Sequence, residues 1–207
     1  MSEMENATQP DTSVTDEQLL FRYVNGDVSA FETLVNRYRR ELFNFLARFL
    51  GDPALAEDVF QEAFLQVHLS AGGFDVTRRL KPWLFTIAAN KARDALRSRS
   101  RRSAAELDAE IGGGEDDSTR FVDLMPGSIP RPEETLENLE SAQSVQNIVQ
   151  QMPENLRSVL LLSYFHQFPY KEIADVLNVP LGTVKSRLHV AVKEFARRWK
   201  AASEKKQ

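Results

Sequence analysis

Residues 168–195, FPYKEIADVLNVPLGTVKSRLHVAVKEF, contain two runs of helical apolar spacing on either side of a tight turn at residues 178–180. The first run packs through Ile173, Ala174 and Leu177, and its alanine is a small residue suited to a helix crossing. The second run starts directly after the turn and gathers its apolar side chains on one face: Val184, Leu188, Ala191 and Phe195. Two helices joined in this way predict a helix-turn-helix.

The opposite face of the second predicted helix is polar and cationic. Its candidate DNA contacts are Thr183, Lys185, Ser186, Arg187, His189 and Lys193. Ser186 and His189 can hydrogen-bond to base edges, while Lys185 and Arg187 flank the face and can contact both backbones. Thr183 can offer its hydroxyl to a phosphate at the positive end of the helix dipole. We therefore predict a helix that reads the major groove of duplex DNA. A generic surface helix of an α-helical bundle is the alternative.

Composition limits the class of protein. The 207 residues include no cysteine, which excludes disulfide scaffolds, thiol nucleophiles and cysteine-based zinc sites. The N-terminus is polar and acidic and lacks the apolar core of a signal peptide, and the apolar runs are too short for a bilayer span. We expect a soluble cytoplasmic protein without membrane insertion.

The net charge of −4 conceals alternating blocks of charge. Residues 78–102 hold nine basic and one acidic side chain, and residues 185–207 hold eight basic and two acidic. Residues 103–143, in contrast, hold two basic and 11 acidic side chains. Basic blocks of this kind are expected of a protein that binds a polyanion, and the acidic remainder weakens indiscriminate binding. Solvated helix faces are the alternative for any single block.

Periodicity predicts an all-α chain with two small helical domains on a tether, and no strand-like alternation occurs. Residues 1–14 are predicted to be a disordered tail. The first domain covers residues 15–102 and the second residues 135–200, followed by a tail at 201–207. Residues 103–134 are acidic and rich in glycine and predict a flexible linker.

Cap signals define several of the predicted helices. Thr15 and Gln18 have the spacing of a capping box at the first helix. Residues 51–53, Gly-Asp-Pro, combine a C-terminal glycine, an N-cap aspartate and a proline at the first position of the next helix. The approximate helix bounds that we expect are 15–23, 29–50, 53–69, 80–102, 135–151, 153–165, 170–177 and 181–200.

The predicted helix at residues 53–69 is apolar on two sides. Its core side is formed by Leu55, Val59, Phe60, Ala63 and Val67. The opposite side carries a mixed patch of carboxylate, amide and leucine side chains: Asp58, Gln61, Glu62, Leu65 and Leu69. Such a helix needs a second partner. From the residues alone, that partner is equally another part of the fold or the surface of another protein.

The next predicted helix and the loop before it interleave aromatic, cationic and amide side chains. The set comprises Phe74, Arg78, Arg79, Lys81, Trp83, Thr86, Asn90, Arg93 and Arg97. Aromatic rings stack on unpaired bases, cations follow the backbone and amides read base edges, so this set predicts binding of single-stranded nucleic acid. A tryptophan of the hydrophobic core is the open alternative for Trp83.

Three ordered motifs together resemble the bacterial RNA polymerase sigma factors, specifically the extracytoplasmic-function group. They are AEDVFQEAFLQV at residues 56–67, PWLFTIAANKARDALR at residues 82–97 and MPENLRSVLLLSYFHQFPYKEIADVLNVPLGTVKSRL at residues 152–188. They look like the polymerase-binding segment, the strand-opening segment that reads the −10 element, and the fourth region that reads the −35 element. The resemblance covers about residues 16–102 and 145–199.

The resemblance implies partners and roles for the candidate residues. Asp58, Gln61 and Glu62, with Leu65 beside them, would contact the clamp helices of the polymerase β′ subunit. The loop at residues 72–79 would hold a base flipped from the non-template strand, with the asparagine and arginines of the following helix nearby. The helix that begins at residue 181 would meet the −35 duplex. The polymerase β flap and an anti-sigma factor are further implied partners, and the linker would thread toward the RNA-exit path.

Two features depart from the family pattern. Val190 and Val192 stand where arginines are usual, so fewer phosphate contacts are expected, and Val190 can lie against a thymine methyl group. The acidic linker is long, from which we hypothesise that it contacts a regulator. Deletion of residues 104–118 without any change in activity or regulation would refute this.

Other function classes fit the sequence less well. Its histidines are scattered, and it has no phosphate-binding glycine loop or nucleophile constellation, so we expect no catalysis, no cofactor and no metal site. The main alternative is a helix-turn-helix repressor or activator, which would bind duplex DNA alone, through a dimer on a palindrome, with its N-terminal domain as sensor or dimerisation module. An adaptor that only binds proteins is disfavoured by the basic blocks.

Overall fold

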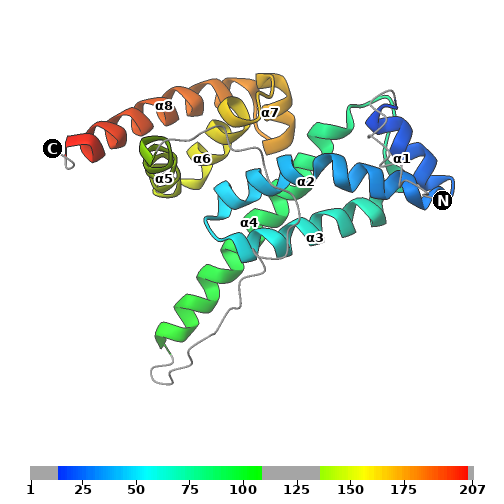
Figure 1. Ribbon diagram of the computed structural model, residues 1–207, viewed down its shortest axis with the longest axis horizontal. Coiled ribbons are helices and arrows are strands. Elements are labelled where there is room, and N and C mark those ends of the chain that lie inside the picture. Colours follow the sequence, from blue (N-terminus) through cyan, green and yellow to red (C-terminus); the bar gives the residue numbers. More distant parts are fainter. Residues whose placement is uncertain (1–13, 109–135, 205–207) are drawn as a thin grey trace, which may run out of the picture.

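The computed structural model describes residues 14–108 and 136–204, and every regular element in these ranges is helical (Figure 1). The N-terminal unit contains α1 (Asp16–Val24), α2 (Val28–Leu50), α3 (Pro53–Ser70), the short η1 (Ala71–Gly73) and α4 (Leu80–Asp108). The C-terminal unit contains α5 (Leu136–Gln150), α6 (Glu154–Leu160), the π-helix η3 (Leu161–Phe165), α7 (Tyr170–Leu177) and α8 (Leu181–Glu204). The all-α prediction is confirmed.

The predicted caps form. At α1, the Thr15 hydroxyl accepts from the backbone N–H of Gln18, whose side chain accepts from the backbone N–H of Thr15. Gly51 ends α2 in the left-handed conformation with φ of 74°, and the Asp52 carboxylate accepts from the first N–H groups of α3. The start of α4 is capped from a distance, because the backbone N–H of Leu80 donates to the Glu17 carboxylate at 2.8 Å.

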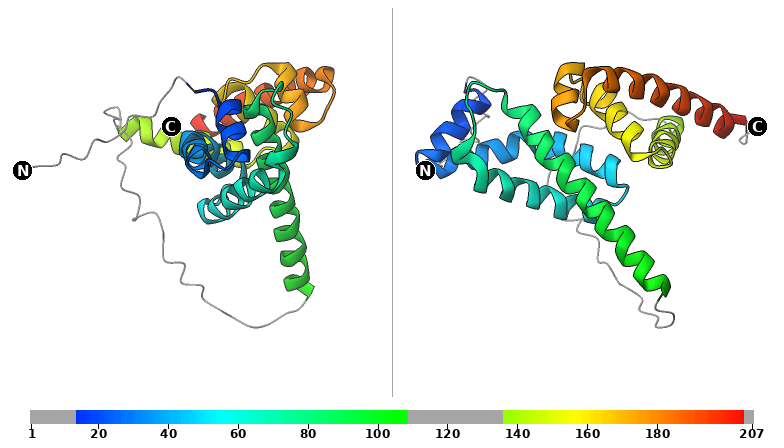
Figure 2. Two further views of the ribbon diagram at one scale, coloured as in Figure 1. Left: turned by 90° about the vertical axis from the view of Figure 1, so that its right-hand side faces the viewer. Right: turned by 180° about the vertical axis from the view of Figure 1, so that it is seen from behind.

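The core of the N-terminal unit lies between α2, α3 and α4, with α1 across one end. Fully buried side chains from these helices include Leu34, Leu42, Phe45, Phe49, Leu84 and Phe85. Small residues on α3 and α4, Ala63, Ala88 and Ala92, are also buried, which lets these helices pack closely. The C-terminal end of α4 projects away from this body (Figure 2).

The C-terminal unit folds around the helix-turn-helix. Ile173, Val184 and Ala191 are fully buried, as the sequence predicts, and Asn178 makes the turn in the left-handed conformation with φ of 51°. Residues 153–165, expected as one helix, are divided between α6 and η3. The π-type turn and the positive φ of Gln167 direct His166 and Phe168 toward the N-terminal unit, where both are buried.

The two units pack against each other in one continuous hydrophobic core. α7 lies along α4, and α5, α6 and η3 contact α2. The last carbonyls of α2, which have no partner within their own helix, are capped by the C-terminal unit. The Gln150 amide donates to the carbonyl of Arg48, and the Arg157 guanidinium donates to the carbonyl of Phe49 at 2.5 Å.

The helix ends differ from the expected bounds at two places. α4 continues to Asp108, and α8 continues to Glu204, so each extends beyond the end that we predicted for its domain. Both extensions are rich in alanine, the best helix former, which outweighs the nearby charge runs. The predicted N-terminal tail and most of the predicted linker lie outside the described residues. Within the described residues, no helix is long and apolar enough to cross a membrane.

Candidate nucleic-acid interface

The outer face of α8 is open to solvent. Lys185, Ser186, His189 and Lys193 are exposed, while Thr183 and Arg187 are half-buried at its edges. The Ser186 hydroxyl donates to the carbonyl of Thr183 at 3.1 Å, which leaves its lone pairs free to accept from a base. The buried side chains of α8, Val184, Leu188 and Ala191, pack toward α7, so the polar side chains lie together on the opposite, exposed face. Its donors and acceptors are of the type that reads the major groove.

Val190 and Val192 belong to the exposed side of α8, with 49% and 38% of their surface accessible. An arginine at either position would point into solvent in this chain as it stands. The structure therefore gives no packing reason for these valines. They place exposed apolar surface beside His189 and Lys193.

The cationic face of the N-terminal unit lies on α4 and on the loop before it. Arg78, Asn90 and Arg97 are exposed. Phe74 and Trp83 are half-buried, and their rings contact each other with centroids 4.7 Å apart. Trp83 thus packs on the edge of the core while keeping part of its surface accessible, a position between the two alternatives that the sequence left open.

Three cations of this face are already paired with carboxylates of other helices, and Arg97 is paired with Asp94 of its own helix at 3.3 Å. Arg79 lies 2.5 Å from Glu172 of α7, and Arg93 lies 3.3 Å from Glu154 of α6. Lys81 lies 2.6 Å from Glu41 of α2 and sits over the ring of Phe168. The pairs of Arg79 and Arg93 join the two units. The sequence did not single out any of the three carboxylates.

His166 and Glu41 form a further polar contact between the units. Their Nδ1 and Oε1 atoms are 3.4 Å apart, and the His166 ring packs edge-on to Phe45. Burial raises the pKa of Glu41, but hydrogen bonds from His166 and Lys81 outweigh it and hold this pKa below its ordinary value. The Nε2 atom of His166 is buried without a hydrogen-bond partner.

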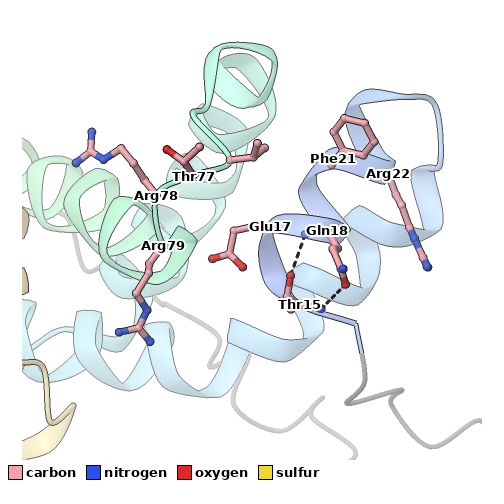
Figure 3. A pocket seen from close by; sticks show the side chains of 9 residues that line it. Thr15, Glu17, Gln18, Phe21, Arg22, Thr77, Arg78 and Arg79 are labelled. Carbon is pink, nitrogen blue, oxygen red and sulfur yellow. Dashed lines mark hydrogen bonds between the residues drawn. The ribbon is translucent and has the colours of Figure 1, made fainter.

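A hollow of about 800 Å³ opens between α1 and the loop before α4 (Figure 3). Its walls are formed by Thr15, Glu17, Gln18, Phe21, Arg22, Val76, Thr77, Arg78 and Arg79. The loop is shaped by Asp75, whose carboxylate accepts from the backbone N–H and the hydroxyl of Thr77. The hydrogen bonds lower the pKa of Asp75, which favours its charged form. Glu17 holds the end of this loop through Leu80, a positioning contact that sequence reasoning missed.

The outward side of α3 is exposed as the sequence predicts. Asp58, Gln61 and Glu62 are accessible, and Leu65 and Leu69 expose 58% and 68% of their surface. Lys91 of α4 approaches Glu62 only at 3.6 Å. No other part of the described chain covers the two leucines. The partner of this side is therefore not found within the described fold.

Comparison with protein families gives two matches that together span both units. The description "Sigma-70 region 2" matches residues 34–102, and "Sigma-70, region 4" matches residues 142–195. The described residues contain no cluster of three or more histidine or acidic side chains arranged to hold a metal ion.

Curated relatives match over most of their length. The ECF RNA polymerase sigma factor SigW of Bacillus subtilis is 34% identical over 164 residues, which cover 79% of this chain and 86% of the relative. The RNA polymerase sigma-H factor of Pseudomonas aeruginosa is 35% identical over 181 residues, covering 86% and 90%.

Two solved structures share the fold. CnrH in complex with the cytosolic domain of CnrY superposes with a TM-score of 0.65 at 22% identity, covering 90% of this chain and 97% of the other. The sigma factor RpoE in complex with the anti-sigma factor NepR from Bartonella quintana gives 0.64 at 21% identity, covering 84% and 98%.

Proposed function

The chain belongs to the sigma-70 family of bacterial RNA polymerase sigma factors, in its extracytoplasmic-function group. From this premise we infer which of its surfaces bind polymerase and which bind promoter DNA. It is a transcription initiation factor that binds core RNA polymerase and directs it to promoters. The alternative of a lone repressor or activator is set aside. That alternative required a sensor or dimerisation module at the N-terminus, where this chain matches region 2.

We propose that the outward side of α3 binds core polymerase. Asp58, Gln61 and Glu62 supply acceptors and an amide, and Leu65 supplies apolar surface for the β′ clamp helices. An exposed apolar patch with a polar rim is the composition expected of a protein interface. The exposure of this side in the folded chain is the single observation that carries the proposal.

The cationic face of α4 and the adjoining hollow are proposed to hold the melted −10 strand. Phe74 and Trp83 offer rings for stacking, Asn90 offers an amide for a base edge, and the arginines and lysine follow the phosphates. The hollow between α1 and the loop has room for a base turned out of the duplex and is lined by both polar and apolar side chains. Holding unpaired bases biases the duplex toward melting, because only the open state is bound.

The outer face of α8 is proposed to read the −35 duplex. Ser186 and His189 would contact base edges, Lys185 and Arg187 the backbone, and Val190 a methyl group. Each promoter contact is weak by itself. Binding both units to polymerase at a fixed separation turns the second contact into an intramolecular step, which raises the joint affinity without new contacts.

The remaining partners follow from the same family. We propose that the C-terminal unit also meets the polymerase β flap, and that an anti-sigma factor controls the chain in the cytoplasm. No catalytic role is assigned to any residue, since nucleotide addition belongs to the polymerase.

The double variant Asp58→Ala/Gln61→Ala tests the polymerase surface. We expect it to lose capture by immobilised bacterial core polymerase, because the acceptor and the amide at the centre of the patch are gone, while its circular dichroism stays that of the wild type. The matched control is Glu32→Ala/Asn36→Ala, which removes an exposed carboxylate and amide from α2. Equal capture of both double variants would refute the assignment of α3.

A further inference from the structure

Closure of the two units places carboxylates of the C-terminal unit on the proposed −10 surface. Glu172 of α7 holds Arg79, and Glu154 of α6 holds Arg93, whose side chain keeps only 18% of its surface accessible. A cavity of about 420 Å³ between α4 and α7 is lined by Arg78, Arg79 and Trp83 on one side and by Lys171, Glu172 and Asp175 on the other. A DNA phosphate backbone that follows α4 would meet the carboxylates of Glu154 and Glu172, which would repel it.

The closed arrangement is held by contacts that cross between the units. His166 and Phe168 pack on Phe85 with ring centroids 5.4 and 4.9 Å away, and His166 lies beside Glu41. Every aromatic and polar side-chain contact described for His166 is with the N-terminal unit. This residue therefore serves the contact between the units and has no described side-chain role within its own unit.

The other proposed surfaces stay open in the same arrangement. Asp58, Gln61 and Leu65 of α3 are exposed, and so are Lys185, Ser186 and His189 of α8. Closure thus engages Arg79 and Arg93 of the single-strand surface in ion pairs with carboxylates. Arg78, Asn90 and Arg97 of that surface stay exposed, as do the polymerase surface and the duplex surface.

We propose that the free chain masks part of its own −10 surface, with Glu154 and Glu172 in place of DNA phosphates at Arg93 and Arg79. His166 is the wedge that holds the units together. This rests on the proposed function of α4. Polymerase binds the accessible side of α3 first, and single-stranded DNA gains the contacts of Arg79 and Arg93 only after the units separate. The apparent affinity of the free chain for single strands is reduced by the fraction that is closed.

His166→Glu tests the wedge. It places a carboxylate against Glu41 in a buried site, so the closed state is disfavoured, whereas in the open state the side chain faces water. The change makes the chain more negative, which by itself weakens binding to DNA. Stronger DNA binding can therefore come only from uncovering the surface. The matched control is Gln167→Glu, the same charge on the exposed neighbouring residue.

Two readouts are made on the full chain. Because the sequence has no cysteine, Asn36→Cys and Ala196→Cys accept a pair of dyes for energy transfer between α2 and α8. A fluorescent single-stranded DNA of random sequence measures affinity. We expect the wild type and Gln167→Glu to give one narrow distance, and His166→Glu to give a broad one with single-strand affinity raised on the order of 10-fold.

A second pair of variants separates the ion pairs from the wedge. Glu154→Gln/Glu172→Gln removes both carboxylates from α4, and Glu194→Gln/Glu204→Gln removes the same charge from pairs internal to α8. We expect the first to bind single strands about 3- to 10-fold more tightly than the second.

An unchanged distance in His166→Glu, or separated units without a gain in single-strand affinity, would overturn the proposal. The distance measurement uses neither polymerase nor DNA. A failure of the capture experiment on α3 would therefore refute the proposed function without altering the result on closure.

Discussion

Replacement of Arg157 by methionine tests the contact at the end of α2. The guanidinium donates to the carbonyls of Phe49, Gln150 and Met152 at 2.5, 2.6 and 3.0 Å. Methionine keeps the length of the side chain but leaves all three acceptors without this donor. Burial partly desolvates the Arg157 guanidinium and lowers its pKa, so removal of the charge recovers part of that desolvation cost.

The magnitude follows from these contacts. A half-buried acceptor that loses its donor costs about 1 kcal/mol, so three cost about 3 kcal/mol, and the relieved desolvation reduces the total to about 2 kcal/mol. With a urea dependence of about 1 kcal/mol per molar for so small a unit, the unfolding midpoint falls by about 2 M.

The assay uses the separate positions of the two tryptophans. Trp83 lies on α4 and Trp199 on α8, so in a Trp83→Phe background the fluorescence of Trp199 reports unfolding of the C-terminal unit. Lys200→Met is the control, since its ammonium is exposed and reaches Glu204 only at 3.9 Å. It should change the free energy of unfolding by less than about 0.5 kcal/mol. A change for Arg157→Met no larger than this would refute the reasoning.

Three other predictions concern the core, pH and DNA. Phe45→Ala, at a fully buried position, should lower the free energy of unfolding by about 3–5 kcal/mol in urea titrations followed by Trp83. The lowered pKa of Glu41 stabilises the fold fully above the ordinary glutamate pKa of about 4.3, and this contribution disappears as pH falls through the folded-state value. The thermal unfolding midpoint of Glu41→Gln should therefore lie below that of the wild type at pH 6 to 8, and the two midpoints should converge in acid. A difference that stays constant with pH would contradict this. Lys185→Ala in the holoenzyme should reduce the slope of log affinity against log salt by about 1 on promoter DNA, whereas an unchanged slope would remove Lys185 from the phosphate contacts.

Local signals carried most of the fold prediction. The capping box at Thr15, the Gly-Asp-Pro boundary at residues 51–53 and the turn before α8 all depend on residues within a few positions of each other. The same holds for the exposed and buried faces of α3 and α8, since helical periodicity alone assigns them. Sequence patterns predict these features because each one is determined by residues within one or two turns of helix.

The contact between the units could not be predicted in this way. Arg157 and Gln150 meet α2 across more than 100 residues of sequence, and His166 meets Glu41 across 125. The π-helix that directs His166 inward has the same apolar periodicity as an ordinary helix, so residues 153–165 gave no warning of it. Glu41, Glu154 and Glu172 are ordinary helix-surface acids in sequence. They acquire a role only because α2, α6 and α7 meet near α4.

The central claim is that this chain gives core polymerase its promoter specificity through two surfaces. Transcription from a randomised promoter library with bacterial core polymerase, with and without the purified chain, tests it most directly. The account predicts transcripts that appear only with the chain and come from templates sharing two short elements at a fixed spacing. No stimulation, together with a shift of duplex DNA by the chain alone, would contradict it.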